Sequence, residues 1–397
     1  MLRKILFNFH WLIGITVGMV LALMGLTGAI MSFQDEILSV LNGRPGHVVP
    51  TGRALSTDEI VARVQAVNPG KQISALIIAD SPEQAVKVEF VRPGGVRPRL
   101  GEDDGSRYFN QYTGEMMAAT LERGRQFMAW NEYLHRSLVP WSSAVAGNDT
   151  PSLDVGKHVT AYATLLLLTM TLTGLYLRWP RRKVGDWRSW LKVNFKLKGY
   201  AFNYNLHAVI GTVALLGYLL SAHSGLMMSE IHWYGDTLNR LAGMEIRRGP
   251  PPANTAGNHT QHRLDMLWDA FKREVPAFHT ATIQLARSNA DELQIRYLLN
   301  KAVTREGGRN TNTLVLDAET GAVKSHDLFS DKPAAQRVLV RNFDLHSGAY
   351  FGMPGRLFIT FTSLMMPVLL VTGWMQYLAR RRHRRQRAEA LKAAQAG

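Results

Sequence analysis

Four long stretches without Asp, Glu, Lys or Arg dominate this sequence of 397 residues. They are residues 11–33, 159–177, 206–229 and 357–379. Each is close to the roughly 20 apolar residues that a helix needs to cross the hydrocarbon core of a bilayer. Buried helices of a soluble protein rarely give four such runs. We therefore expect a membrane protein with four transmembrane α-helices, the first of which is retained and is not a cleaved signal peptide.

The basic residues lie beside these stretches and account for the net charge of +15. The segments before the first run, between the second and third, and after the fourth hold 2, 8 and 7 basic residues against two acidic ones in all. Positive loops stay on the cytoplasmic side. We expect both termini in the cytoplasm of a bacterial inner-membrane protein. Anionic lipid is the expected partner of these charges, and nucleic acid is not.

The expected order of segments follows from the runs and the charges. Transmembrane helices are expected at 7–33, 158–179, 205–229 and 356–379, periplasmic domains at 34–157 and 230–355, and basic cytoplasmic segments at 180–204 and 380–397. The chain has no cysteine. Disulfides, iron–sulfur clusters, thiolate zinc sites and covalent c-type haem attachment are therefore excluded.

The sequence is also internally duplicated. His10 and His207 each occupy the third position of an Asn-x-His-x-x-Ile-Gly sequence at the start of a span. A glycine follows each histidine after 18 residues, and a Thr-Gly pair occurs near the end of the second and fourth spans. Leu-His pairs containing His135 and His346 precede those spans. The chain thus consists of two copies of span, outer domain, Leu-His and span.

The two outer segments carry the same pattern. In the first, Ser56 can cap a helix over 57–67, and strands are expected at 73–79 and 85–91. In the second, a helix is expected at 264–274 and strands at 280–286 and 292–299. A further strand ending at Thr-Gly, which favours a hairpin turn, completes each copy. Two periplasmic α+β domains are the expected result.

At this point a resemblance is evident. The helix, strands and Thr-Gly turn of each copy resemble a PepSY domain. With Leu134-His135-Arg136-Ser137 and the paired His-bearing spans, residues 5–380 are similar to the PepSY-associated transmembrane family. Members near this length include bacterial inner-membrane ferrisiderophore reductases (FoxB-type) that bind b-type haem. The resemblance therefore implies haem b and reduction of a ferric siderophore, whereas the spacing alone implies only membrane histidines.

Of the membrane histidines, His10 and His207 are the first candidates for haem ligands. They lie at equivalent depths in the two copies, and haem iron takes one imidazole on each face. The alternative is that each only bonds a neighbouring hydroxyl or carbonyl. His223 follows His207 by 16 residues, which is about 24 Å along a helix and nearly the opposite side. It is expected to pair with His158 in a second site, although neither has a histidine at its repeated position.

His135 and His346 are counterparts just outside the spans. They could ligate haem, bind substrate, relay protons or simply be solvated. Other candidates carry less weight. Methionine is an alternative axial ligand, but a Met within a span is usually packing, and His259-x-x-His262 lacks a nearby third ligand for a metal ion. The span methionines considered are Met227, Met228, Met365 and Met366.

Two haems at different depths would conduct electrons across the membrane. The chain has no Gly-rich nucleotide motif after a strand, so a quinol or a redox protein is the expected donor and a periplasmic ferric siderophore the acceptor. Two alternatives stay open: an iron–siderophore transporter without a redox role, and a PepSY membrane anchor that regulates a partner protein. Candidate substrate contacts beside the outer histidines are Trp130, Tyr133, Arg136 and Tyr350.

Overall fold

The computed structural model describes residues 1–42, 46–91, 105–117, 122–138, 151–179, 190–244, 263–285, 291–300 and 310–396. The chain divides into two compact units. The helical unit comprises Met1–Phe33, Trp130–Leu238 and Asn342–Gly397, and the sheet unit comprises Gln34–Ala129 and Asn239–Arg341.

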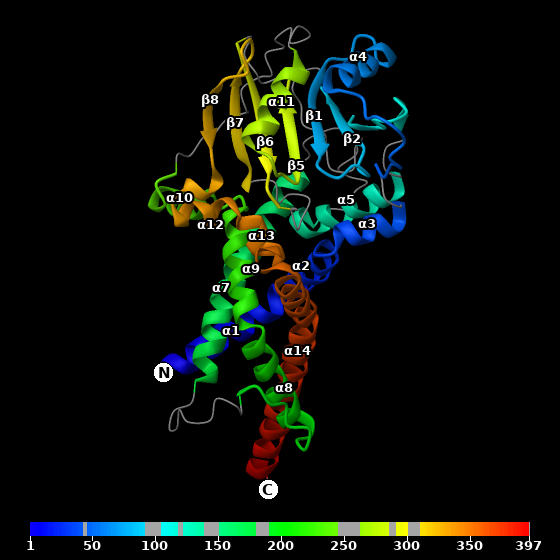
Figure 1. Ribbon diagram of the computed structural model, residues 1–397. Coiled ribbons are helices and arrows are strands. Elements are labelled where there is room, and N and C mark those ends of the chain that lie inside the picture. Colours follow the sequence, from blue (N-terminus) through cyan, green and yellow to red (C-terminus); the bar gives the residue numbers. More distant parts are fainter. Residues whose placement is uncertain are drawn as a thin grey trace. The chain divides into compact units, whose positions relative to one another are not determined.

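The helical unit consists of helices and one 3₁₀ turn (Figure 1). Two of them, α5 and α10, extend past the boundary of the unit. The elements are α1 (Leu2–Thr16), α2 (Gly18–Met31), α5 (Glu122–Ser137), α7 (Pro151–Arg178), α8 (Gly199–Val213), α9 (Leu215–Met227), α10 (His232–Leu241), α13 (Asn342–Ser347), the 3₁₀ turn η6 (Ala349–Phe351) and α14 (Gly352–Ala396).

Two helical stretches of the described chain, Val155–Arg178 and Ala349–Gln395, are long and apolar enough to cross a membrane. The pairs α1–α2 and α8–α9 add two more candidates if each pair is one span. These pairs are bent by 61° and 56°, whereas the sequence predicts straight helices. The bends fall at Val17 and Ala214, each seven residues after the histidine that opens its span.

A threonine hydroxyl close to each bend bonds to the backbone of the preceding turn. Thr16 Oγ1 donates to the carbonyl of Leu12 at 2.9 Å, and Thr212 Oγ1 donates to the carbonyl of Ala208 at 2.7 Å. A threonine that bonds the carbonyl four residues earlier competes with the helix ladder and often bends the helix. Hydropathy does not register this effect.

The bends let each broken span contact two different straight helices. Helix α1 packs against α7 and α2 packs along α14; correspondingly, α8 packs against α14 and α9 along α7 (Figure 1). Helices α2 and α14 approach closely at Gly25 of α2, where a Cβ atom would lie 2.5 Å from the carbonyl oxygen of Ser363. The bundle is therefore interlocked, with each half of a bent span on a different partner.

The sheet unit holds an eight-stranded antiparallel sheet in the order β4-β3-β2-β1-β5-β6-β7-β8 (Figure 1). The central pair, β1 with β5, joins the two halves of the chain. The strands are β1 (Ile73–Ala79), β2 (Val86–Phe90), β3 (Arg107–Phe109), β4 (Met116–Met117), β5 (Thr280–Gln284), β6 (Glu292–Leu298), β7 (Asn312–Asp317) and β8 (Val323–Asp327). The helical elements are α3 (Gln34–Asn42), α4 (Thr57–Val67), α11 (Leu264–Glu274), η5 (Phe329–Asp331) and α12 (Ala334–Val340).

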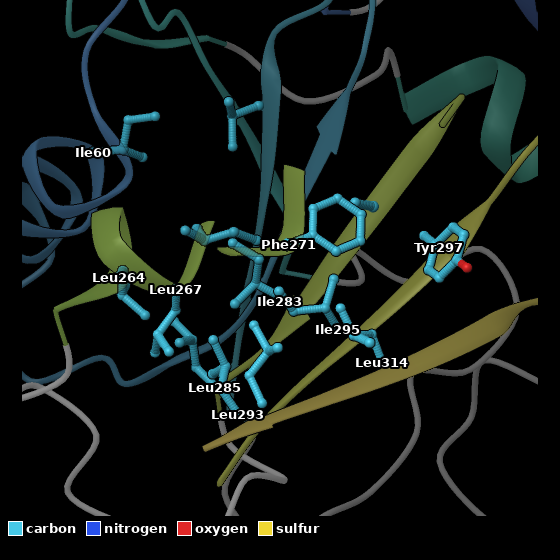
Figure 2. Packing of buried hydrophobic residues seen from close by; sticks show 14 of the residues in the cluster. Ile60, Leu264, Leu267, Phe271, Ile283, Leu285, Leu293, Ile295, Tyr297 and Leu314 are labelled. Carbon is cyan, nitrogen blue, oxygen red and sulfur yellow. The ribbon is translucent and has the colours of Figure 1, made fainter. Parts of the chain in front are cut away.

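One continuous core supports this sheet. Apolar side chains of α4 and α11 pack with the alternating buried residues of the strands, as expected for a sheet covered by helices on one face. Figure 2 shows Phe271 and Leu267 of α11 beside Ile283 of β5 and Ile295 of β6. The sequence places α4, α11 and β1 at their observed bounds, but it predicts two separate domains where the structure has one joined sheet.

The N-termini of α4 and α11 cap each other across the two halves. Asp265 Oδ1 accepts from Thr57 Oγ1 at 2.7 Å and from the Asp58 amide at 3.0 Å. Reciprocally, Asp58 accepts from the amides of Leu264 and Asp265 at 3.0 and 3.1 Å. The expected Ser56 cap is present as well, as a capping box with Glu59. These carboxylates satisfy amides that a helix leaves unpaired at its start.

Replacing Asp265 by alanine is expected to lower the free energy of unfolding of the sheet unit by about 1–2 kcal/mol, because two donors on α4 lose their acceptor. Burial raises the pKa of Asp265, but hydrogen bonds from Thr57, Ser56 and Asp58 outweigh it and hold the pKa below its ordinary value. The carboxylate therefore stabilises the fold above the unfolded pKa of about 4. That contribution disappears as the pH falls through the lower, folded pKa.

Hydrogen exchange of the α4 and α11 amides in the full chain measures both effects. The matched control is Asp269→Ala on the same helix, because Asp269 is exposed and pairs only with Lys272 among the described residues. Equal effects of the two substitutions would contradict the cross-capping role.

Candidate functional site

The first group of candidate residues lines a cavity of about 470 Å³ in the helical unit, which we call the inner cavity. Its walls come from all four candidate spans and are mainly apolar. His10 of α1 and His207 of α8 both line it. The structure thus brings together the two histidines that the repeat predicts as a pair.

A threonine holds each of these imidazoles. His10 Nδ1 lies 3.0 Å from Thr173 Oγ1, and His207 Nδ1 lies 2.8 Å from Thr372 Oγ1. Each hydroxyl donates its own hydrogen to the carbonyl four residues earlier, at 2.9 and 2.8 Å. A hydroxyl has one hydrogen, so it must accept from Nδ1–H. Nε2 of each ring is therefore unprotonated and able to bind a metal ion.

The second group is formed by His135 and His346, whose ring centroids lie 6.1 Å apart. His135 Nδ1 is 2.9 Å from the carbonyl of Met24 and 3.1 Å from Thr27 Oγ1. His346 Nδ1 is 2.9 Å from Ser224 Oγ. A carbonyl can only accept, so Nδ1 of His135 carries the proton. Neither ring is fully exposed, which disfavours simple solvation as an account of them.

An asparagine one turn before each outer histidine completes this arrangement. Asn131 Nδ2 donates to the main-chain carbonyl of Thr27 at 2.9 Å, and Asn342 Nδ2 donates to that of Ser224 at 2.9 Å. Both asparagines are buried. The histidine thus bonds to the side chain of Thr27 or Ser224, and the asparagine bonds to the backbone carbonyl of the same residue. These two bonds fix the position of each outer histidine.

A glycine follows each of the four hydroxyl residues and leaves room for the imidazole. A Cβ atom at Gly28 would lie 3.0 Å from Cε1 of His135, and one at Gly174 would lie 3.2 Å from Cε1 of His10. The corresponding distances at Gly225 and Gly373 are 3.5 and 3.7 Å. Four hydroxyl–glycine dipeptides therefore each hold one histidine, and we call them the imidazole cradles. They are Thr27-Gly28, Thr173-Gly174, Ser224-Gly225 and Thr372-Gly373.

The donor sets suit haem iron. With metal–nitrogen bonds of ~2 Å, two imidazoles on opposite sides of one metal ion have centroids roughly 6 Å apart. The 6.1 Å between His135 and His346 matches this separation. The inner cavity lies within the roughly 300–1,000 Å³ of typical cofactor sites. All four imidazoles are bonded through Nδ1, which leaves Nε2 as the nitrogen that would bind iron.

Comparison with protein families agrees with the sequence resemblance. The model of the PepSY-associated TM region matches residues 7–380. The chain belongs to the PepSY-associated transmembrane family. It is accordingly a membrane protein, consistent with its apolar helices. A search of curated protein sequences returned no match.

In this PepSY-associated protein, His158 and His223 have different surroundings. His158 is exposed on α7. His223 is half-buried on α9, and its Nδ1 lies 2.8 Å from Tyr234 Oη of α10. The bond to Tyr234 accounts for one ring nitrogen of His223. The proposed pairing of the two histidines stays a prediction.

The remaining candidates also stay predictions. Met366 lines the inner cavity, so methionine ligation there is sterically open. Trp130 is 41% exposed, and Arg136 pairs with Glu132 on α5 beside His135. The Tyr350 ring packs edge-to-face against Phe351, with ring centroids 5.2 Å apart. His259 and His262 lie outside the described residues.

Sequence reasoning missed the residues that orient the imidazoles. Thr27, Ser224, Asn131 and Asn342 are polar residues in ordinary helical contexts, and none of them binds metal itself. Two signals could have found them. The hydroxyl–glycine dipeptide recurs at four related positions of the repeat, and an Asn precedes both outer histidines by four residues.

Proposed function

We propose that this PepSY-associated protein is a haem b-dependent inner-membrane reductase. It passes electrons across the membrane to a periplasmic ferric siderophore, which releases Fe(II). The observation that carries the proposal is the presence of two histidine pairs, each oriented through Nδ1 so that Nε2 is free for iron. Bound haem would supply one-electron redox chemistry.

The depth of the two pairs supports transfer across the membrane. Thr27, which contacts His135 of the outer pair, lies on the same bent span as His10 and follows it by 17 residues. A straight helix of that length would rise about 25 Å, which approaches the thickness of a bilayer core, and the bend shortens it. Hydroxyls and glycines from neighbouring helices hold the rings, and the walls of the inner cavity are mainly apolar.

The charge distribution supports an orientation for this transfer. Both termini and the basic loop 180–204 would face the cytoplasm, and the segments 34–157 and 230–355 the periplasm, with four spans between them. The inner pair is then close to the cytoplasmic side and the outer pair close to the periplasm. A quinol or redox protein would supply the electron. Reduction to Fe(II) loosens the hard oxygen ligands of a siderophore.

The visible spectrum of the full chain purified from haem-replete cells tests this proposal. A Soret band and a sharp reduced α band are expected, with two haems per chain. Addition of a ferric siderophore to the reduced protein under nitrogen should reoxidise it, and an Fe(II) chelator should trap one Fe(II) per electron. A colourless protein would favour the membrane-anchor alternative, whereas a red protein that the siderophore leaves reduced would exclude this acceptor.

A further inference from the structure

One end of the inner cavity is strongly basic. Arg3, Lys4, Arg178 and Arg380 all line it, together with His10 and the apolar walls, and none of the described lining residues is acidic. We call these four residues the basic rim. Positive charge beside an apolar cavity is costly unless an anion is close by.

The contacts of the basic rim within the described part of the chain are to neutral groups. Arg3 donates to the carbonyl of Leu177. Arg380 donates to Tyr200 Oη at 3.0 and 2.7 Å and lies 4.2 Å from the centre of the Phe7 ring.

Arg178 is the member of the basic rim with an unsatisfied hydrogen-bond donor among the described residues. Its guanidinium lies 5.9 Å from the Trp190 ring, and its Nε atom is buried with no hydrogen-bond partner among the residues that the structure describes. A buried donor without a partner costs about 1–3 kcal/mol. A ligand with an anionic group at this end of the cavity would remove that cost.

The basic rim lies at a fixed offset from the histidine pair. Arg3 precedes His10 by seven residues, which is two helical turns, or about 10 Å, on nearly the same face of α1. Arg178 follows Gly174 of a cradle by four residues, and Arg380 follows Gly373 of another by seven. Arg3, Arg178 and Arg380 therefore each lie one or two helical turns from the inner imidazoles. All three lie on the side of the imidazoles away from the outer pair.

We propose that the basic rim binds the two carboxylates of a metalloporphyrin whose iron lies between His10 and His207. This rests on the proposed function and adds an orientation to it. The carboxylate edge of the ring faces the basic rim, and the opposite, apolar edge faces the part of the cavity lined by Leu21 and Met366. Guanidinium–carboxylate bonds are charge-assisted and give geometric specificity as well as affinity.

The experiment compares haem with its dimethyl ester, which keeps iron and ring but has no carboxylate. Full-length protein from haem-deficient cells is titrated in detergent with each compound. Binding at the inner site is taken as the Soret change that wild type shows and the His10→Ala chain lacks. Wild type is expected to prefer haem by roughly 10- to 100-fold, the range for charge-assisted hydrogen bonds. Arg178→Gln and Arg3→Gln should each lower that preference, with binding of the ester unchanged.

Arg384→Gln is the matched control, because it removes one charge from the same helix as Arg380 at an exposed position. It should keep the preference of wild type. Equal affinity of wild type for haem and its ester would refute carboxylate binding by the basic rim and would leave the reductase proposal intact. If neither compound binds at the inner site, the proposed function and the proposed role of the basic rim are both refuted. Variants that bind the ester normally are folded at this site, so misfolding is separated from loss of the anion contact.

Discussion

His10→Ala and His207→Ala are each expected to remove the same one of two haems from the purified chain. The two imidazoles line one cavity, and a ring bound from one side alone loses half of its axial ligation. Haem content should fall from two to one per chain, and the remaining haem should have the same spectrum in both variants. The measurement is the pyridine haemochrome content together with the low-temperature reduced spectrum.

A matched control is available in the same chain. His232 is largely exposed and pairs with Glu230, so His232→Ala should keep both haems. His10→Gly supplied with free imidazole should regain the lost haem, because the small base can occupy the space of the side chain. Retention of both haems in His10→Ala or in His207→Ala would refute the inner pair, and loss of different haems in the two variants would refute their sharing of one.

Gly28→Val is expected to abolish the outer haem with little effect on the inner one. Even a Cβ atom at this position would lie 3.0 Å from Cε1 of His135, and the valine methyl groups extend further toward the ring. The imidazole would be displaced from Thr27 and Met24, and the 6.1 Å separation of the His135 and His346 ring centroids would be lost. Haem content and the separate midpoint potentials of the two centres measure this outcome.

Met19→Val is the control for a valine in the same helix. Met19 lies on α2, is 70% exposed and is not among the residues that line the inner cavity. Both haems should remain in that variant. If Gly28→Val also kept both, the cradle would have no role in holding the outer imidazole. The smaller change Gly373→Ala, with 3.7 Å available, should likewise be tolerated.

Much of the sheet unit could be predicted from local pattern. A short strand-like apolar run locates β1, and the Ser56 signal with Glu59 locates the start of α4 at its observed residue. The turns at Gly114 and Gly321 have positive φ, as the Thr-Gly pairs suggest. The pairing of β1 with β5 could not be predicted from local pattern. The pattern of apolar residues in a strand indicates which face is buried, but it does not indicate which strand pairs with each edge.

For the helical unit, the repeat was the informative signal. It predicts the association of His10 with His207 and of His135 with His346, and the structure brings the members of each pair together. Hydropathy gave no indication of the bends at Val17 and Ala214, because it averages over the whole apolar run. The orienting Thr, Ser and Asn residues were missed because their role exists only once the helices are packed.

The exchange of helix partners at the two bends has an evolutionary consequence. Each inner histidine is held within its own half of the chain, by α7 for His10 and by α14 for His207, whereas α2 and α9 cross to the other half. A chain of half this length would enclose either site only as two intertwined copies. Fusion of the copies makes the halves free to diverge, and His223, which stands where the first half has Leu26, marks a position at which they have done so.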